Sequence, residues 1–266
     1  MKYARCLFIF LSSFFYFALN CLAYDIEPYL KQSSWESKER AFSFIFCSLG
    51  YQDKEIFLQD IDALVQRLEK TRPFDEINTM GFWRVFISKE EGGIIFKRAQ
   101  GFPPLKVRGD FLDDILSQLK SNYKLIIIDA LGSVSCAELS SLDKMSLIIL
   151  GRARYKDKDS FTKGFLHELG HSLGLRDEGP NSEAALCLPG PPNCAATEEE
   201  AQKWWGDLAG KVPRVHYIRG CCGNQSYVRP TIASLMNDPD KAGDFGVVNE
   251  RYLKKVLGKY GVRPQP

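Results

Sequence analysis

The stretch FLHELGHSLGLRDE, from Phe165 to Glu178, is the most informative part of this chain, because it carries two of the three histidines. His167 and His171 are four residues apart, and residues at this spacing lie one above the other on one face of a helix. Two imidazoles in this arrangement suit a single tetrahedral Zn²⁺ ion. Glu168 stands beside the first histidine, where a carboxylate can accept a proton from a water that zinc has acidified.

The residues after the second histidine extend this pattern to HExxHxxGxxD. Gly174 comes where a helix that ends and turns sharply needs a residue that tolerates positive φ. Asp177 follows three residues later and is placed to return as a third metal ligand. A bare HExxH can arise by chance, with two surface histidines and a solvated glutamate. The Gly174 and Asp177 extension favours the metal site over this interpretation.

HELGHSLGLRD resembles the zinc signature of the metzincin metallopeptidases, with Asp177 where most of that clan has a third histidine. The Asp177–Glu178 pair is similar to the pattern of the secreted bacterial IgA-peptidase-type metallopeptidases. Two other segments, SLGYQDKEIFLQDIDALVQRLEKTRPFDE (48–76) and YVRPTIASLMND (227–238), resemble family segments in the same order. The resemblance spans about residues 41–260, although only the zinc motif is specific. It implies a metzincin-like zincin fold, peptidase activity, and Met236 in the methionine turn beneath the metal.

Other residues are weaker candidates for the site. His216, in strand-like sequence, is an alternative third ligand to Asp177, but a packed structural histidine is the simpler interpretation. Glutamates 198–200 would offer the third ligand if the site followed the glutamate-ligand zincins, yet acids in the first turn of a helix usually complement its dipole. Tyr227 is a possible hydrogen-bond donor to a developing oxyanion, or an ordinary core or surface tyrosine.

The hydrophobic pattern alternates between strand and helix periods along the chain. It predicts strands at 41–49, 82–88, 123–130 and 145–151, and helices at 55–70, 110–121, 159–174, 197–210 and 249–260. Asp110 and Ser160 are candidate helix caps. This alternation predicts an α/β fold with a mixed, mostly parallel sheet on which the active-site helix packs. We expect one catalytic domain over 41–266, with an upper subdomain at about 41–176 and a smaller, loop-rich C-terminal subdomain at about 177–266.

The N-terminus has the pattern of a secretory signal peptide over residues 1–23. Lys2 and Arg5 precede an apolar run, and small residues stand at Cys21 and Ala23. The apolar run is shorter than the roughly 20 residues of a spanning helix, so we expect cleavage after Ala23 and no membrane span in the mature chain. Residues 24–40 are expected to form a polar leader.

Charge and cysteine content narrow the functional class. The chain has 35 basic and 33 acidic residues, and loss of Lys2 and Arg5 leaves a formally neutral mature protein without the basic footprint of a nucleic-acid-binding protein. Six cysteines remain after cleavage, an even number that permits disulfides in an exported chain. We expect at least one bridge within one group of four cysteines, and a thiolate zinc cluster is the weaker alternative because CxxC spacing is absent. This group consists of Cys187, Cys194, Cys221 and Cys222.

These patterns predict a secreted or periplasmic zinc-dependent peptidase in which Glu168 is the general base and His167, His171 and Asp177 hold the zinc. It would be a monomer acting on a protein or peptide substrate, and activity would be lost at acidic pH as these groups become protonated. A zinc-stabilised, non-catalytic binding or adhesion domain is the main alternative. An exported structural domain with a fortuitous motif is the third.

Overall fold

The computed structural model describes residues 26–28, 42–77, 80–98, 105–118, 123–138, 146–180 and 187–260. The expected signal peptide and most of the expected leader lie outside these residues. In the described part, the main sheet has the strand order β1-β3-β2-β6-β8-β7. These strands are β1 (Glu27–Pro28), β3 (Met80–Val85), β2 (Phe42–Leu49), β6 (Tyr123–Asp129), β8 (Ser146–Gly151) and β7 (Cys136–Ala137). The four central strands are parallel and the two short edge strands are antiparallel.

Both faces of the central strands are buried, which explains their almost continuous apolar sequences. In β2, Phe44 and Phe46 point into one hydrophobic cluster, whereas Ile45 and Cys47 point into the other. This alternation with a period of two is the geometry of a strand covered on both sides. The sheet is therefore the middle layer of the molecule.

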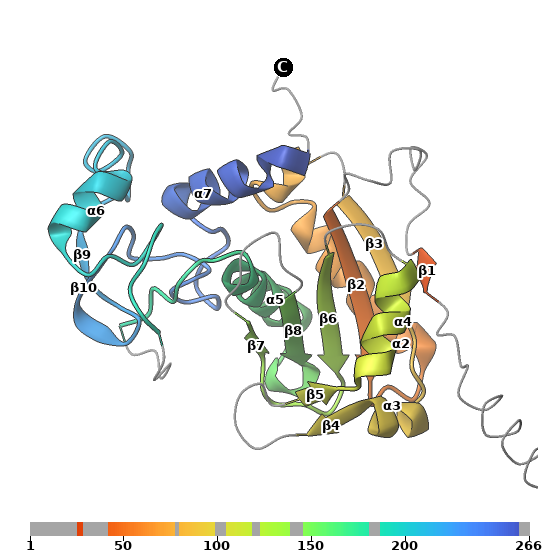
Figure 1. Ribbon diagram of the computed structural model, residues 1–266. Coiled ribbons are helices and arrows are strands. Elements are labelled where there is room, and N and C mark those ends of the chain that lie inside the picture. Colours follow the sequence, from red (N-terminus) through yellow and green to blue (C-terminus); the bar gives the residue numbers. More distant parts are fainter. Residues whose placement is uncertain are drawn as a thin grey trace, which may run out of the picture.

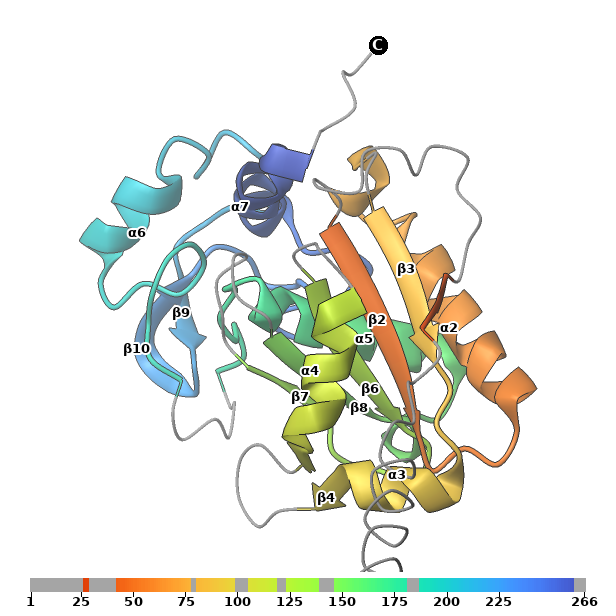
Figure 2. The ribbon, with the colours of Figure 1, turned by 45° about the vertical axis from the view of Figure 1, so that its right-hand side comes forward.

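Helices cover the two faces of this sheet unequally (Figures 1 and 2). One face is covered by α2 (Lys54–Leu68) and α5 (Lys158–Ser172), whose apolar side chains join the larger cluster. The other face is covered by α4 (Gly109–Gln118), with α3 (Lys89–Ile95) and the hairpin of β4 (Phe96–Arg98) and β5 (Leu105–Val107) beside it. This three-layer arrangement buries α5 against the sheet.

The chain beyond α5 is rich in loops. It contains α6 (Glu198–Trp205), the hairpin of β9 (Ile218–Cys221) and β10 (Asn224–Arg229), and α7 (Val247–Leu257). The described residues also include three single-turn 3-10 helices: η2 (Phe74–Glu76), η3 (Arg152–Arg154) and η4 (Gly258–Tyr260). Trp205 centres a small separate core, whereas Leu253 and Leu257 of α7 belong to the large cluster under the sheet. The C-terminal part therefore packs directly on the main core.

The structure confirms the predicted α/β class and the mostly parallel sheet, and it corrects several local expectations. Asp157, not Ser160, caps α5, because its carboxylate accepts from the backbone N–H of Ser160 in a capping box. Asp110 lies inside α4, which begins at Gly109. Part of the expected leader joins the sheet, where Glu27 of β1 forms an ion pair with Arg84.

Two disulfides confirm the expectation of a bridge among the late cysteines. Cys187 bonds to Cys222 and Cys194 bonds to Cys221, so both bridges tie the 187–194 loop to the β9–β10 hairpin. Cys47 is a free, buried thiol. Among the described residues, no helix is long and apolar enough to cross a membrane.

Candidate metal centre

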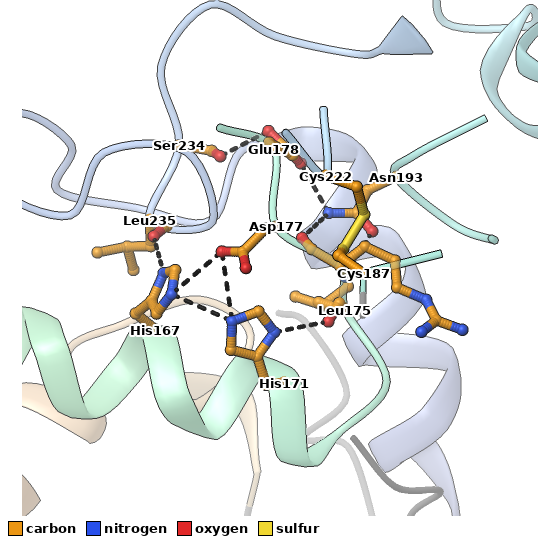
Figure 3. A network of polar contacts seen from close by, with 11 residues as sticks. His167, His171, Leu175, Asp177, Glu178, Cys187, Asn193, Cys222, Ser234 and Leu235 are labelled. Atoms are coloured by element: carbon orange, nitrogen blue, oxygen red, sulfur yellow. Dashed lines mark hydrogen bonds and ion pairs between the residues drawn. A yellow bond between two sulfur atoms is a disulfide. The ribbon is translucent and has the colours of Figure 1, made fainter. Parts of the chain in front are cut away.

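Helix α5 carries both histidines and ends at Ser172, two residues before the predicted end at Gly174. Gly174 has φ of 101°, a conformation that favours glycine, and the N–H of Leu175 bonds back to the carbonyl of Gly170 at 2.9 Å. The chain therefore reverses immediately after the helix. Asp177 returns over the face that presents His167 and His171, as Figure 3 shows.

The three side chains converge on one point. Nε2 of His167 lies 3.1 Å from Nε2 of His171, and Oδ1 of Asp177 lies 3.4 Å from each of these nitrogens. Among the described residues, these three form the one group of His, Cys, Asp or Glu side chains close enough to hold a metal ion. We call them the metal centre.

The donor set fits a tetrahedral metal in both geometry and protonation. With metal–ligand bonds of about 2.0–2.1 Å, the edges of a ligand tetrahedron measure roughly 3.3 Å, close to the three separations found here. Nδ1 of His167 lies 2.7 Å from the carbonyl of Leu235, and Nδ1 of His171 lies 3.0 Å from that of Leu175. A carbonyl only accepts, so each Nδ1 donates its hydrogen, and each Nε2 is left to offer a lone pair.

In the absence of a metal, a protonated imidazole and the Asp177 carboxylate stabilise each other's charge in the metal centre. Burial alone would lower the pKa of His167, but the Asp177 carboxylate and nearby Glu168 raise it to about 9. Burial alone would raise the pKa of Asp177, whereas hydrogen bonds from the two imidazoles bring it well below its usual range. The site is therefore built to hold positive charge between its three donors.

Glu168 is buried, with 8% of its surface exposed, and lies on α5 between the two ligand histidines. Burial raises the pKa of its carboxyl, although the neighbouring imidazoles lower it in part. No hydrogen-bond donor of the described residues contacts this carboxylate. A buried carboxylate without a partner is costly to maintain, and such groups cluster at functional sites.

Met236 packs against α5. It is fully buried, and a Cβ added at Gly170 would stand only 2.4 Å from its sulfur. Gly170, within HELGH, thus lets the methionine approach the helix between the two histidines. The preceding residue, Leu235, supplies the carbonyl that orients His167. We call residues 234–237 the Met turn.

Glu178 was not assigned a role by the sequence alone. It is completely buried, and burial raises the pKa of its carboxyl while hydrogen bonds to it act in the opposite direction. The donors are Ser234, Asn193 and Asn249, at 2.7, 2.9 and 2.8 Å. Because these partners lie 15 to 71 residues away in sequence, local pattern analysis had no signal for them.

The disulfide region contacts the third ligand through its backbone. The N–H of Cys222 donates to the carbonyl of Asp177 at 3.0 Å, and the N–H of Gly223 donates to the carbonyl of Gly179 at the same distance. The Cys187–Cys222 bridge lies next to Asp177 in Figure 3. The disulfide-bonded part of the chain therefore supports the segment that carries Asp177.

Neither His216 nor glutamates 198–200 belong to the metal centre. His216 is exposed, and its backbone bonds to Pro230 and Trp205. Glutamates 198–200 occupy the first turn of α6, where the carboxylate of Glu200 accepts from the N–H of Ala196. Tyr227 in β10 packs against the disulfide-bonded cysteines. Its role as an oxyanion donor stays a prediction.

Comparison of the sequence with models of known protein families finds no match, and comparison with curated proteins finds none either.

Proposed function

We propose that this chain is an exported zinc-dependent peptidase in which His167, His171 and Asp177 hold the metal and Glu168 is the general base. The observation that carries the proposal is the pairing of a tetrahedral donor set with a buried carboxylate, that of Glu168, to which none of the described residues donates a hydrogen bond. A purely structural zinc site has no need for such a carboxylate. The two disulfides support an oxidising compartment, secreted or periplasmic.

A bound zinc ion would polarise the scissile carbonyl and lower the pKa of the attacking water. Glu168 accepts the proton of that water and afterwards delivers it to the leaving amine. Burial raises the pKa of Glu168 and so makes its carboxylate a better proton acceptor than an exposed one. The backbone carbonyls of Leu235 and Leu175 keep both imidazoles in the tautomer that offers Nε2 to the metal.

The β7 edge of the main sheet is a suitable place for an extended peptide substrate to bind. Strand β7 is the last strand of the sheet, pairs with β8 on one side, and packs next to α5. An extended peptide can add to such an edge through main-chain hydrogen bonds. A substrate bound in this way would run beside the helix that carries Glu168, as cleavage requires.

The test compares the chain from residue 24 onward with its Glu168→Gln variant, both produced in an oxidising compartment. Each is assayed for bound zinc and then incubated with a pool of denatured proteins, whose new termini are read by mass spectrometry. We expect one zinc per chain in both proteins and a loss of turnover of about 10²–10⁴-fold or more in the variant, because the proton acceptor is missing. Glu199→Gln, an exposed glutamate of α6, is the matched control and should cleave like the parent.

The outcomes separate the three hypotheses. Zinc in both proteins with cleavage by the parent alone supports the peptidase. If both proteins bind zinc, neither cleaves any substrate, and Glu168→Gln changes only the stability of the fold, the chain is the non-catalytic binding domain. Absence of stoichiometric zinc from the parent would contradict the proposed site.

A further inference from the structure

We propose that Glu178 is a positioning residue that fixes Asp177 and the Met turn around the metal centre. This inference rests on the proposed function, because it explains how the third ligand is held in place. Glu178 directly follows Asp177 and is completely buried. Figure 3 shows its carboxylate pointing away from the imidazoles, toward Ser234 and Asn193.

The carboxylate of Glu178 joins three segments that are distant in sequence. Oε2 accepts from the hydroxyl of Ser234 in the Met turn, and Oε1 accepts from the amides of Asn193 and Asn249. Asn193 belongs to the disulfide-bonded loop, and Asn249 belongs to α7. Each of these segments contacts Glu178 through a different side chain, so the carboxylate sets their mutual distances.

The backbone of Glu178 reinforces the same connection. Its N–H donates to the carbonyl of Met236 at 2.8 Å, and its carbonyl accepts from a guanidinium nitrogen of Arg229. Met236 packs against α5 between the ligand histidines, and Leu235 orients His167. A displacement of Glu178 would therefore move both Asp177 and the Met turn, which orients His167.

The three hydrogen-bond donors around Glu178 also explain why this residue is an acid. A carboxylate only accepts and can receive all three donors at once. Loss of the side chain leaves the buried amides of Asn193 and Asn249 without this acceptor, which is costly in a dry interior. A glutamine keeps one acceptor oxygen for the two amides, and its NH₂ can donate to Ser234 if that hydroxyl rotates. Glutamine should therefore restore much of the arrangement, whereas alanine cannot.

The experiment measures zinc affinity by competition with a chelator, using the folded chain from residue 24 onward. The variants are Glu178→Ala, Glu178→Gln and Ser234→Ala, the last of which removes one donor and leaves Glu178 in place. Asp60→Asn is the matched control, because Asp60 is also a buried carboxylate with donors, Tyr51 and Arg152, but lies on α2. Thermal unfolding is recorded for every protein.

We expect Glu178→Ala to weaken zinc binding by about 10–100-fold, the usual effect of removing a group that orients a metal ligand. Glu178→Gln should recover most of this loss, and Ser234→Ala should weaken binding by less than Glu178→Ala does. Asp60→Asn should lower the melting temperature and leave zinc affinity unchanged.

Failure of this inference is distinct from failure of the proposed function. The positioning role alone would be overturned if the parent binds zinc and the variants bind it with the same affinity. These variants are Glu178→Gln, Ser234→Ala and, if it folds, Glu178→Ala. If Glu178→Ala does not fold, Ser234→Ala decides, because it changes a single hydroxyl. A parent that binds no zinc would overturn both proposals.

Discussion

Two buried glutamates ten residues apart, Glu168 and Glu178, show how the surroundings of a residue determine its use. Glu178 receives three side-chain hydrogen bonds, which hold its carboxylate to the Met turn, the disulfide-bonded loop and α7. Glu168 has no such donor among the described residues, although burial raises the pKa of its carboxyl as it does for Glu178. Glu178 therefore suits a structural role, and Glu168 suits proton transfer.

The raised pKa of His167 gives a pH-dependent stability in the metal-free chain. Its pKa is about 9 in the fold, against 6.5 for an ordinary histidine. The protonated imidazole therefore stabilises the fold fully below pH 6.5, and this stabilisation is lost as pH rises through about 9. We expect urea unfolding in the presence of a chelator to show a decrease of up to roughly 3 kcal/mol over this range.

A His167→Asn variant removes this contribution, and the titratable groups that lie outside the metal centre are common to both proteins. The difference in unfolding free energy between parent and variant should shrink as pH rises from 6.5 to about 9.5. With zinc bound, the parent should lose this dependence, since the metal replaces the proton. A parent–variant difference that stays constant across this pH range would contradict the charge arrangement described for the metal centre.

The convergence of His167, His171 and Asp177 could be predicted from sequence because it depends on local geometry. The i, i+4 spacing of His167 and His171 and the positive φ of Gly174 follow from one helix and its end. The roles of Gly170 and Glu178 could not be predicted in the same way. They depend on the sulfur of Met236 and on donors that come close only when the C-terminal part folds over α5.

At the scale of elements, the disulfide-bonded loop and the β9–β10 hairpin support Asp177, the proposed third ligand. We expect removal of the Cys187–Cys222 bridge, by substitution of both residues with serine, to weaken zinc binding by about tenfold. The physical reason is that the N–H of Cys222 donates to the carbonyl of Asp177. The same change should cost about 2–4 kcal/mol of stability in denaturant unfolding.

The second bridge provides the comparison for this prediction. Serine at both Cys194 and Cys221 opens a loop of similar length between the same two segments, so its cost in stability should be similar. Its effect on zinc affinity should be smaller, because the Cys187–Cys222 bridge still restrains the residue whose backbone N–H donates to Asp177. Equal zinc affinities for the Cys187/Cys222 variant and the parent would show that this bridge does not support the metal centre.

Elements with long apolar runs were predictable, and short elements were not. Strands β2, β6 and β8 and helices α2 and α5 appear near their expected positions because burial dictates their sequences. Strand β7 has two residues, and the β9–β10 hairpin contains polar residues and a register shift. Such segments are defined by their partners and carry no periodic signal.

At the scale of the whole molecule, the metal centre joins two parts of the fold. The three-layer αβα part supplies His167 and His171 from α5, and the loop-rich C-terminal part supplies the Met turn, the disulfides and α7. Helix α7 packs in the main hydrophobic cluster, so the C-terminal part has a fixed position over the histidines. A metal bound by all three ligands would link these parts further and raise the melting temperature.

The most direct test of this account is zinc X-ray absorption spectroscopy on the chain from residue 24 onward, loaded with one equivalent of zinc. We expect two imidazole nitrogens and carboxylate or water oxygens at about 2.0–2.2 Å, with no sulfur in the coordination shell. Asp177→Ala should lose oxygen ligation and affinity while keeping both imidazoles. A sulfur shell at about 2.3 Å, or failure of the parent to bind zinc, would contradict the assignment of His167, His171 and Asp177 as the metal ligands.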